Sequence, residues 1–480
     1  MGLSEYDFSL NPLSIGLLLL AILTLWFYKR QGRAKLPPGP WHIPFIGNAW
    51  ELASDPDLRK SLRRLHKQYG DIYRLYMGPT LAVVISGYEA IKEVFVKRGG
   101  EFSDRPDSLA TNLIGEKQGT LDLEKTSLEG KIQKEVSILL SEIAKQNEKP
   151  FHIQLPVQTS VSNVISAMVF GGHFNHNDTR FAEMMKMLDE NFESSGPNTV
   201  VAFFPFLRFL PGDLFRVKRT LRNAKGVEGF IGELVDKHIE NFDENKMEDF
   251  IDAFLLEMKN NQDQKDSTFT KKQLIKTVAN LFVAGTETTT TTITWAALYL
   301  AAKPDIQARV FREMKEIVGT ESLPSLQDKR NLVYTEAFIM EVLRVSNIVT
   351  ISLPHTCTVD TKLRGFDIPK GTTLLPDIDS VLFDPKIWSD PEEFRPERFI
   401  SEEGTLLKPD EFIPFFTGRR NCVGESLARM ELYLFITALV QRFEFLPPEG
   451  TTLNIKEIDG VFGITHKPKP FEIRAKLRKE

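Results

Sequence analysis

The sequence predicts a mainly α-helical protein that is attached to a membrane by its N-terminus. Three features lead to this prediction: an apolar segment at residues 13–28, a long apolar-rich run at 271–302, and a helix-compatible run at 425–435 directly after Cys422. In the last run Leu427, Met430, Glu431 and Leu434 recur at helical spacing. The 480 residues are 42% hydrophobic and 26% charged, which is ordinary for a folded globular protein.

The apolar N-terminal segment predicts a membrane anchor at residues 1–28. Together with residues 10–12, the run at 13–28 approaches the roughly 20 residues that span a bilayer as a helix. Acidic residues precede it and basic residues follow it, so everything after residue 29 is expected on the cytosolic side. The basic residues are Lys29, Arg30, Arg33 and Lys35. A cleaved signal peptide would carry its basic residues before the apolar run, so we expect the anchor to be uncleaved.

A stiff connection is predicted between the anchor and the rest of the chain. Residues 36–40 read Leu-Pro-Pro-Gly-Pro. Consecutive prolines fix φ, remove amide donors and keep the chain extended. Residues 29–44 are therefore interpreted as a basic, proline-rich hinge.

Composition and motif searches exclude several classes of function. The net charge of -5 and the pI near 6.0 give no general attraction to nucleic acid. Cys357 and Cys422 are the only cysteines, which rules out a disulfide framework and fits a reducing compartment. No GxxxxGK[ST], GxGxxG, GxSxG, HExxH or CxxC motif occurs. His173 and His176 lie three residues apart, but no neighbouring carboxylate or cysteine completes a metal site.

The segment from Phe415 to Gly424, F-F-T-G-R-R-N-C-V-G, predicts a metal-binding cysteine. Cys422 lies just before the predicted helix, where free amide donors and the helix dipole favour a thiolate, the form that ligates metal. Gly418 and Gly424 allow a tight turn and a close approach to a flat ligand. Arg420 can donate two hydrogen bonds to a carboxylate.

The run at 271–302 predicts a helix with a local defect. It contains Ala-Gly-Thr-Glu-Thr at 284–288, followed by more threonines. Gly285 lowers helix stability, and the Thr288 hydroxyl can bond to the carbonyl of Ala284 four residues back. We expect a gap there for oxygen and water, with Thr288 and Glu287 as proton donors. The alternative is a buried helix that merely tolerates threonine.

Taken together, these motifs resemble the cytochrome P-450 superfamily. The resemblance extends from the proline hinge to the C-terminus and is strongest to the animal microsomal type that oxidises drugs and fatty acids. The family pattern FxxGxRxCxG is matched at Phe415, Gly418, Arg420, Cys422 and Gly424, and residues 284–288 match AGx[DE]T. The resemblance implies a mainly α fold with small β-sheets, in which residues 45–480 form one haem-binding monooxygenase domain behind the transmembrane anchor. It also implies haem b, with Cys422 as the proximal ligand, a thiolate that favours O–O cleavage in this family.

The resemblance assigns roles to further residues. Thr288 and Glu287 would be catalytic, and Phe415, Arg420 and Gly424 would contact the haem. Arg105 and His355 resemble the family's contacts to the haem propionates. The ExxR motif at Glu341 and Arg344, with Arg398 of a PERF motif, implies a buried ion triad that supports structure and haem retention. The residues expected to line the substrate pocket are Phe206, Phe282, Ala284, Leu353 and Phe462.

Partners and location are also implied by the resemblance. Electrons would come from NADPH through NADPH-cytochrome P-450 reductase, with cytochrome b5 as a second candidate donor. The substrate would be a lipophilic small molecule: a fatty acid, a steroid or a xenobiotic. The protein would lie in the endoplasmic reticulum membrane with its catalytic domain in the cytosol. No nucleic-acid partner is expected.

One element of the family is missing from the sequence. Family members carry a helix with a WxxxR motif whose tryptophan and arginine bind a haem propionate, but no tryptophan occurs here between residues 51 and 294. Residues 115–125 lead directly into what resembles the following helix, so an element of about 20 residues is absent. Two haem anchors and a basic surface that receives the reductase would be lost with it. A rival interpretation is therefore a membrane-anchored, haem-poor pseudoenzyme or truncated isoform. A third, isomerase or dehydratase chemistry without a reductase, is opposed by the intact Thr288 motif.

Overall fold

The computed structural model describes residues 35–43, 46–48, 51, 55, 57–106, 125–174, 178–194, 201, 205–264, 267–462 and 465–478. The predicted anchor at 1–28 and the stretch at 115–124, where the family element is missing, lie outside these residues. Within the described ranges, no helix combines the length and the apolar character needed to cross a bilayer.

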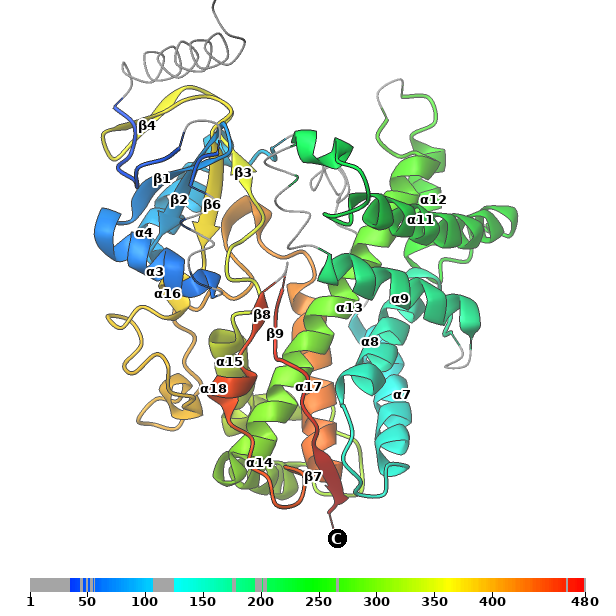
Figure 1. Cartoon of the computed structure of the whole chain (residues 1–480). Coiled ribbons are helices and arrows are strands. Elements are labelled where there is room, and N and C mark those ends of the chain that lie inside the picture. Colours follow the sequence, from blue (N-terminus) through cyan, green and yellow to red (C-terminus); the bar gives the residue numbers. More distant parts are fainter. Residues whose placement is uncertain are drawn as a thin grey trace, which may run out of the picture.

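Helices dominate the described chain, and small β-sheets accompany them, which confirms the predicted fold class (Figure 1). The larger helices are α3 (Leu58–Tyr69), α7 (Lys125–Ala144), α8 (Gln154–Val169), α9 (Thr179–Glu193), α11 (Val217–Glu240), α12 (Phe250–Asn260), α13 (Lys271–Ala302), α14 (Pro304–Ile317), α15 (Val333–Ser346) and α17 (Glu425–Arg442). The short ones are α4 (Tyr88–Ile91), η1 (Lys92–Lys97), α5 (Gly99–Phe102), η2 (Pro205–Phe209), η3 (Asp328–Arg330), α16 (Asp379–Leu382), η4 (Pro396–Phe399), η5 (Gly418–Arg420) and α18 (Ile455–Ile458).

The main sheet has four strands in the order β1-β2-β6-β3. These strands are β1 (Ile72–Met77), β2 (Thr80–Ser86), β6 (Thr373–Asp377) and β3 (His355–Thr356). β2 runs antiparallel to β1 and parallel to β6, with Val84 opposite Leu375. Three two-stranded sheets pair β4 (Thr361–Leu363) with β5 (Phe366–Ile368), β7 (Phe443–Leu446) with β10 (Arg474–Leu477), and β8 (Val461–Phe462) with β9 (His466–Lys467).

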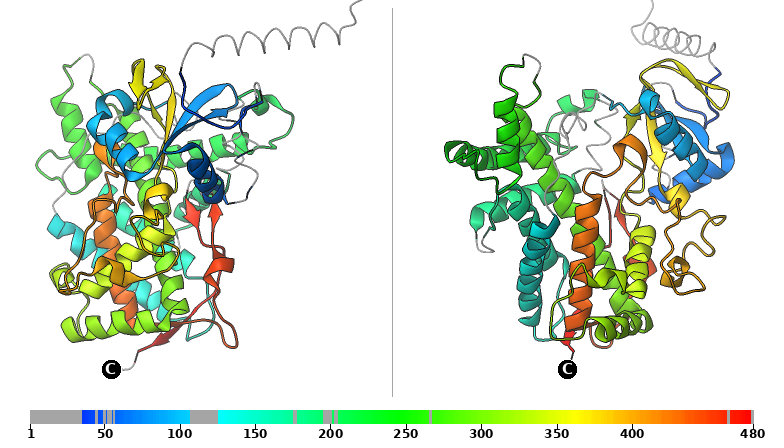
Figure 2. Two further views of the ribbon diagram at one scale, coloured as in Figure 1. Left: turned by 90° about the vertical axis from the view of Figure 1, so that its left-hand side faces the viewer. Right: turned by 180° about the vertical axis from the view of Figure 1, so that it is seen from behind.

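Helix α13 runs through the middle of the molecule, with α17 beside it in all three views (Figures 1 and 2). It starts where the Thr270 side chain accepts a hydrogen bond from the amide of Gln273, a typical N-cap. It ends at Ala302, because Pro304 forces Lys303 out of the helical conformation and opens α14 at its first position. Its C-terminal half is buried among α8, α15 and α17 in the largest apolar core. The helix is therefore held rigidly at the centre of the fold.

Helix α17 follows the predicted metal-binding cysteine, as the sequence predicts, and it continues beyond Phe435 to Arg442. From Met430 to Gln441 every side chain is buried. The N-terminal end of α17 therefore lies next to the exposed Cys422, and the rest of the helix is fixed in the core.

Candidate active site

The loop before α17 is shaped by one glycine and one backbone hydrogen bond. Gly418 has φ +80°, and a Cβ there would lie 2.2 Å from the carbonyl oxygen of Phe95, so only glycine fits. The amide of Cys422 donates to the carbonyl of Phe415 at 2.9 Å, which closes the loop. The Arg429 guanidinium lies 4.9 Å from the centre of the Phe415 ring. The cysteine is thus presented by a fixed turn.

Of the two cysteines, Cys422 is the one available to a ligand. Cys357 is buried, and its thiol donates to the carbonyl of Val359 at 2.9 Å, whereas Cys422 is exposed. A Cβ at Gly424 would lie 3.9 Å from Cys422 Sγ, an ordinary van der Waals contact, so this distance does not by itself require glycine.

The surroundings of Cys422 act on the pKa of its thiol in two directions. Desolvation by surrounding protein atoms raises the pKa of the thiol above its ordinary value, although the amide of Gly424 acts in the opposite direction. A raised pKa favours the thiol as long as no metal is bound. Metal coordination deprotonates a thiol directly, so the residue still fits a metal-ligand role.

Arg105, His355 and Arg420 come together from three distant segments on the same side as the cysteine loop. Arg105 donates to the carbonyls of Leu353 and Pro354 at 2.8 and 2.9 Å. Arg420 donates to the carbonyl of Ser103 at 2.8 Å. Burial and the charge of Arg420 lower the pKa of Arg105 to about 10. Neither arginine forms an ion pair within the described ranges, so two cationic groups lie near each other without a carboxylate.

His355 completes this cluster. Its Nδ1 lies 2.9 Å from the carbonyl of Phe102, which can only accept, so Nδ1 carries the hydrogen. Its Nε2 is buried and has no partner in the described structure. Burial, together with the charge of Arg105, lowers the pKa of His355 to about 4. A bound carboxylate would supply the missing partner once Nε2 takes up a proton, which the negative charge of the carboxylate favours. An anionic, carboxylate-bearing cofactor such as haem b fits these donors and the soft sulfur two residues after Arg420.

Thr288 forms the bond that its position in the sequence predicts. Its Oγ1 donates to the carbonyl of Ala284 at 2.8 Å, and Ala284 is exposed although most of the following residues of α13 are buried. Gly285 does not open the gap that we expected, because a Cβ at this position would lie 2.6 Å from Cδ1 of Ile165 in α8. The glycine allows α8 to pack closely, and the open surface belongs to Ala284 and Thr288.

Glu287 points to a different neighbour from the one that the motif suggests. Its side chain is 4% exposed, and Oε1 lies 2.6 Å from Nζ of Lys467. The hydroxyl of Thr465 also donates to Oε1, at 3.0 Å. Glu287, which directly precedes Thr288 in the chain, is therefore paired with the C-terminal segment in this conformation.

The predicted pocket residues lie in different environments. Phe282 has no exposed surface and packs against Phe170 and Phe181 in the core between α8, α9 and α13. Leu353 is 39% exposed, and Ala284 is also exposed. Phe206 lies in η2 and Phe462 in β8, but their side chains are outside the described part.

The structure brings Glu341, Arg344 and Arg398 together as one ion network. Arg344 Nε lies 2.8 Å from Glu341 Oε2, and Arg398 Nε lies 3.0 Å from Glu341 Oε1. The side chains of Glu341 and Arg344 are 0% exposed and that of Arg398 is 4% exposed. Arg344 also donates to the carbonyls of Leu382 and Pro391. The network therefore ties α15 to the loops that lead to η4.

Several neighbours of the site could not be recognised from the sequence. Phe95 and Phe416 hold the His355 ring edge-on, with centroid distances of 4.6 and 5.6 Å. Phe416 lies inside the cysteine motif, so its position in the sequence could have pointed to the site. No motif surrounds Phe95, or Lys467, the partner of Glu287. His173, interpreted as ordinary, lies 2.8 Å from the buried carboxylate of Glu135, far from it in sequence.

A second cluster that could hold a metal by position is better explained as an ion pair. His238, Asp249 and Asp252 lie close together. The two ring nitrogens of His238 face the carbonyl of Leu234 and the carboxylate of Asp249, both at 2.9 Å. The hydrogen bond to Asp249 raises the pKa of His238 to about 9, despite partial burial. Both ring nitrogens are therefore occupied by hydrogen bonds within the protein, and the pairing of His238 with Asp249 accounts for the cluster.

Comparison with known proteins identifies relatives over nearly the whole chain. The family model described as cytochrome P450 matches residues 37–123 and 116–475. Cytochrome P450 2C3 of Oryctolagus cuniculus is 38% identical, over 91% of this chain and 93% of the relative. Cytochrome P450 2U1 of Homo sapiens is 33% identical, over 98% and 95%. Cytochrome P450 2F3 of Capra hircus is 36% identical, over 97% and 99%.

The family match is interrupted where the sequence lacks an element. Its two pieces meet at residues 116–123. The alignment with the Oryctolagus cuniculus protein has 458 positions, but it covers 91% of the 480 residues here, so about 20 positions are filled by the relative alone. Both observations agree with an absent helix of about 20 residues.

Proposed function

We propose a specific reaction for this chain, which belongs to the cytochrome P450 family. Members of this family bind haem b through a cysteine thiolate and act as monooxygenases on lipophilic substrates. The proposed reaction inserts one oxygen atom from O2 into a fatty acid, a steroid or a xenobiotic. The electrons come from NADPH through NADPH-cytochrome P-450 reductase, with cytochrome b5 as a second candidate donor. The protein acts at the endoplasmic reticulum membrane, held by an anchor at residues 1–28, with the domain at 45–480 in the cytosol.

The observation that carries the proposal is the cluster of Arg105, His355 and Arg420 beside the Cys422 loop. Two arginines without ion pairs in the described chain, and a buried histidine nitrogen without a partner there, favour a carboxylate-bearing ligand. Arg420 lies two residues before Cys422, so the donors for the carboxylates and the sulfur for the metal belong to one loop. This combination fits haem, which carries both carboxylates and an iron that a thiolate can ligate.

The chain's own groups then have distinct tasks. Haem bound at Cys422 supplies the activation of O2. Arg105, His355 and Arg420 hold its carboxylates, and Phe415 and Gly424 shape the loop around it. Thr288 offers a hydroxyl on the exposed face of α13, where it can hold or pass a proton.

Three further groups serve these tasks. Glu287 holds a negative charge next to Thr288. The ion triad of Glu341, Arg344 and Arg398 keeps the surrounding loops in place. Leu353 and Ala284, with Phe206 and Phe462, are proposed to contact the substrate.

A carbon monoxide difference spectrum of the reduced, purified protein tests the proposal. We expect the shifted band of a thiolate-ligated haem. Cys422→Ser should lose this band, because a hydroxyl is not a soft anionic ligand for iron, whereas Cys357→Ser should keep it. A normal thiolate band in Cys422→Ser, or its absence from the unmodified chain supplied with haem, would overturn the assignment.

A second candidate function follows from the interrupted family match at 116–123. Without the WxxxR element the chain could be a membrane-anchored, haem-poor pseudoenzyme or truncated isoform with little activity. Haem content distinguishes the two: a monooxygenase purifies with close to one haem per chain, and a pseudoenzyme does not.

A further inference from the structure

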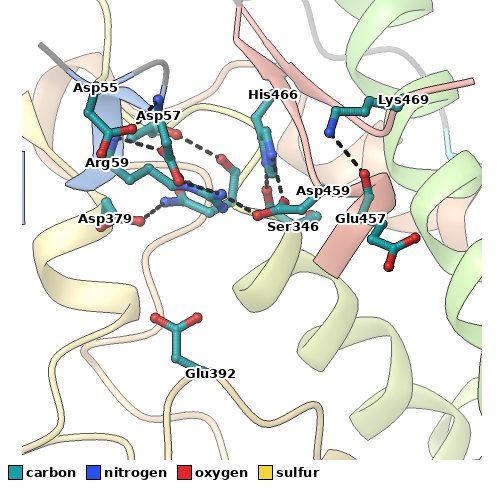
Figure 3. A network of polar contacts seen from close by, with 12 residues as sticks. Asp55, Asp57, Arg59, Ser346, Asp379, Glu392, Glu457, Asp459, His466 and Lys469 are labelled. Carbon is teal, nitrogen blue, oxygen red and sulfur yellow. Dashed lines mark hydrogen bonds and ion pairs between the residues drawn. The ribbon is translucent and has the colours of Figure 1, made fainter. Parts of the chain in front are cut away.

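The C-terminal hairpin of β8 and β9 is fixed next to α13 by a polar network (Figure 3). The amide of His466 donates to the carbonyl of Ile348 at 2.8 Å, and its Nδ1 lies 2.7 Å from the carbonyl of Ser346. Trp295 of α13 donates through Nε1 to the carbonyl of His466 at 3.1 Å. All three hydrogen bonds involve His466, which directly precedes Lys467 and fixes its backbone position.

An ion pair from the N-terminal part of the fold reinforces the hairpin. Asp459 lies 2.6 Å from Arg59 Nη2 in α3 and 3.2 Å from His466 Nε2 (Figure 3). Burial raises the pKa of Asp459, but the bonds to His466 and Arg59 outweigh burial and lower it to about 2. The carboxylate is therefore charged at any physiological pH, and the base of the hairpin is anchored on both sides.

Lys467 extends from this anchored segment to Glu287. The distance between Lys467 Nζ and Glu287 Oε1 is 2.6 Å, with side-chain exposures of 25% and 4%. The same ammonium lies 5.3 Å from the centre of the Phe192 ring in α9. Within the described ranges, Glu287 forms no ion pair with any other cation. A buried carboxylate without a counter-charge is strongly unfavourable, and Lys467 supplies that counter-charge.

We propose that Lys467 is a positioning residue for the proton transfer at Thr288. It holds the Glu287 carboxylate in an ion pair and directs it to the hairpin. Because Lys467 is 25% exposed and Glu287 only 4%, the lysine also connects the buried carboxylate with bulk water. The inference rests on the proposed monooxygenase function, because only there does a proton have to reach Thr288.

A double-mutant cycle on the free energy of unfolding tests the pairing without any catalysis. Lys467→Met should lower the stability of the chain, and most of this loss should disappear when Glu287 is already Gln, because a neutral amide needs no counter-charge. Lys467→Arg should restore the stability. Lys469→Met is the matched control, because Lys469 lies on the same segment but donates to the carbonyl of Glu457 instead. Independent, additive effects of Lys467→Met and Glu287→Gln would overturn the pairing.

The coupling of NADPH consumption to product tests the role. Lys467→Met and Glu287→Gln should each lower the product formed per NADPH by about tenfold, within the range of a positioned proton donor, and the double variant should be no worse. Lys467→Arg should recover coupling, and Lys469→Met should not change it. Full coupling in Lys467→Met would overturn the role. If the unmodified chain lacks a thiolate-type carbon monoxide band, the proposed function fails, and the unfolding cycle still decides whether Lys467 holds Glu287.

Discussion

Arg105 lies near enough to Arg420 for the charge of Arg420, added to burial, to lower the pKa of Arg105 to about 10. Both guanidiniums donate only to backbone carbonyls in the described structure. Such an arrangement of like charges is stabilised when an anion binds between them.

Arg105→Gln and His355→Gln should each weaken haem binding roughly ten- to hundredfold. The reason is the loss of one charge-assisted hydrogen bond of about 1.5–3 kcal/mol to a haem carboxylate. Titration of the haem-free chain with haem, followed by absorbance, measures the effect. Arg419→Gln is the control, since Arg419 is an exposed neighbour of Arg420. Equal affinities for all three variants would contradict the assignment of this cluster.

Thr288→Ala should retain haem and its thiolate band but release more peroxide per NADPH. The hydroxyl on the exposed face of α13 is lost, so product formation should fall by about tenfold or more. Thr294→Ala is a matched control, because Thr294 makes the same bond to a carbonyl four residues back, at 2.8 Å, in the buried part of the helix. Unchanged coupling in Thr288→Ala would exclude a role in proton transfer.

Glu341→Gln should destabilise the fold by about 3–5 kcal/mol, because it leaves the fully buried Arg344 without its counter-charge. Denaturant unfolding measures the loss. Glu397→Gln removes a partner of Arg309 from a pair that is 43–49% exposed, and such pairs contribute about 0–1 kcal/mol. Similar losses in both variants would show that burial does not set the strength of the Glu341 network.

The link between α11 and α12 should weaken at alkaline pH. The folded-state pKa of His238, about 9, lies above its ordinary 6.5, so its pair with Asp249 stabilises the fold fully below pH 6.5. This contribution, at most about 3 kcal/mol, is lost as the pH rises from 6.5 through 9. The difference in unfolding free energy between the native chain and His238→Gln should shrink over that range. His152→Gln is the control, because the His152 side chain is 59% exposed and lies 3.8 Å from the carboxylate of Glu472.

Restoring the missing element tests the origin of any haem deficiency. A helix of about 20 residues carrying Trp and Arg, inserted between Gly119 and Leu123, should raise haem content and reductase-supported turnover together. Two additional bonds of about 1.5–3 kcal/mol each are large beside a typical net stability of about 5–15 kcal/mol. If the unmodified chain already purifies with one haem per chain and turns over equally fast, then the absence of the element is harmless.

The mainly helical fold and the residues of the local motifs could be predicted, because their information lies within a few positions. Cys422 before a helix, Thr288 four residues after Ala284, and Glu341 three residues before Arg344 all express helical or loop geometry directly.

Contacts between distant segments could not be predicted. The Lys467–Glu287 pair spans 180 positions, and no spacing rule relates its members. The same limit explains one error and one omission. Gly285 has no side chain, but the sequence does not reveal that Ile165 of α8 occupies the space beside it. Desolvation of the Cys422 thiol, which raises its pKa, likewise comes from the folded chain around it and cannot be read from the local sequence.

The pairing of β2 with β6 also affects how the chain is made. Val84 lies opposite Leu375, so β2 has to wait for a partner that is synthesised 291 residues later. At about 5–20 residues per second, the apolar edge formed by Val83, Val84 and Ile85 leaves the ribosome about 15–60 s before β6 exists. An unpaired apolar edge can associate with other chains, and pairing over such a separation is slow. Expression at low temperature and with abundant chaperones should therefore raise the yield of soluble protein more than changes at the active site.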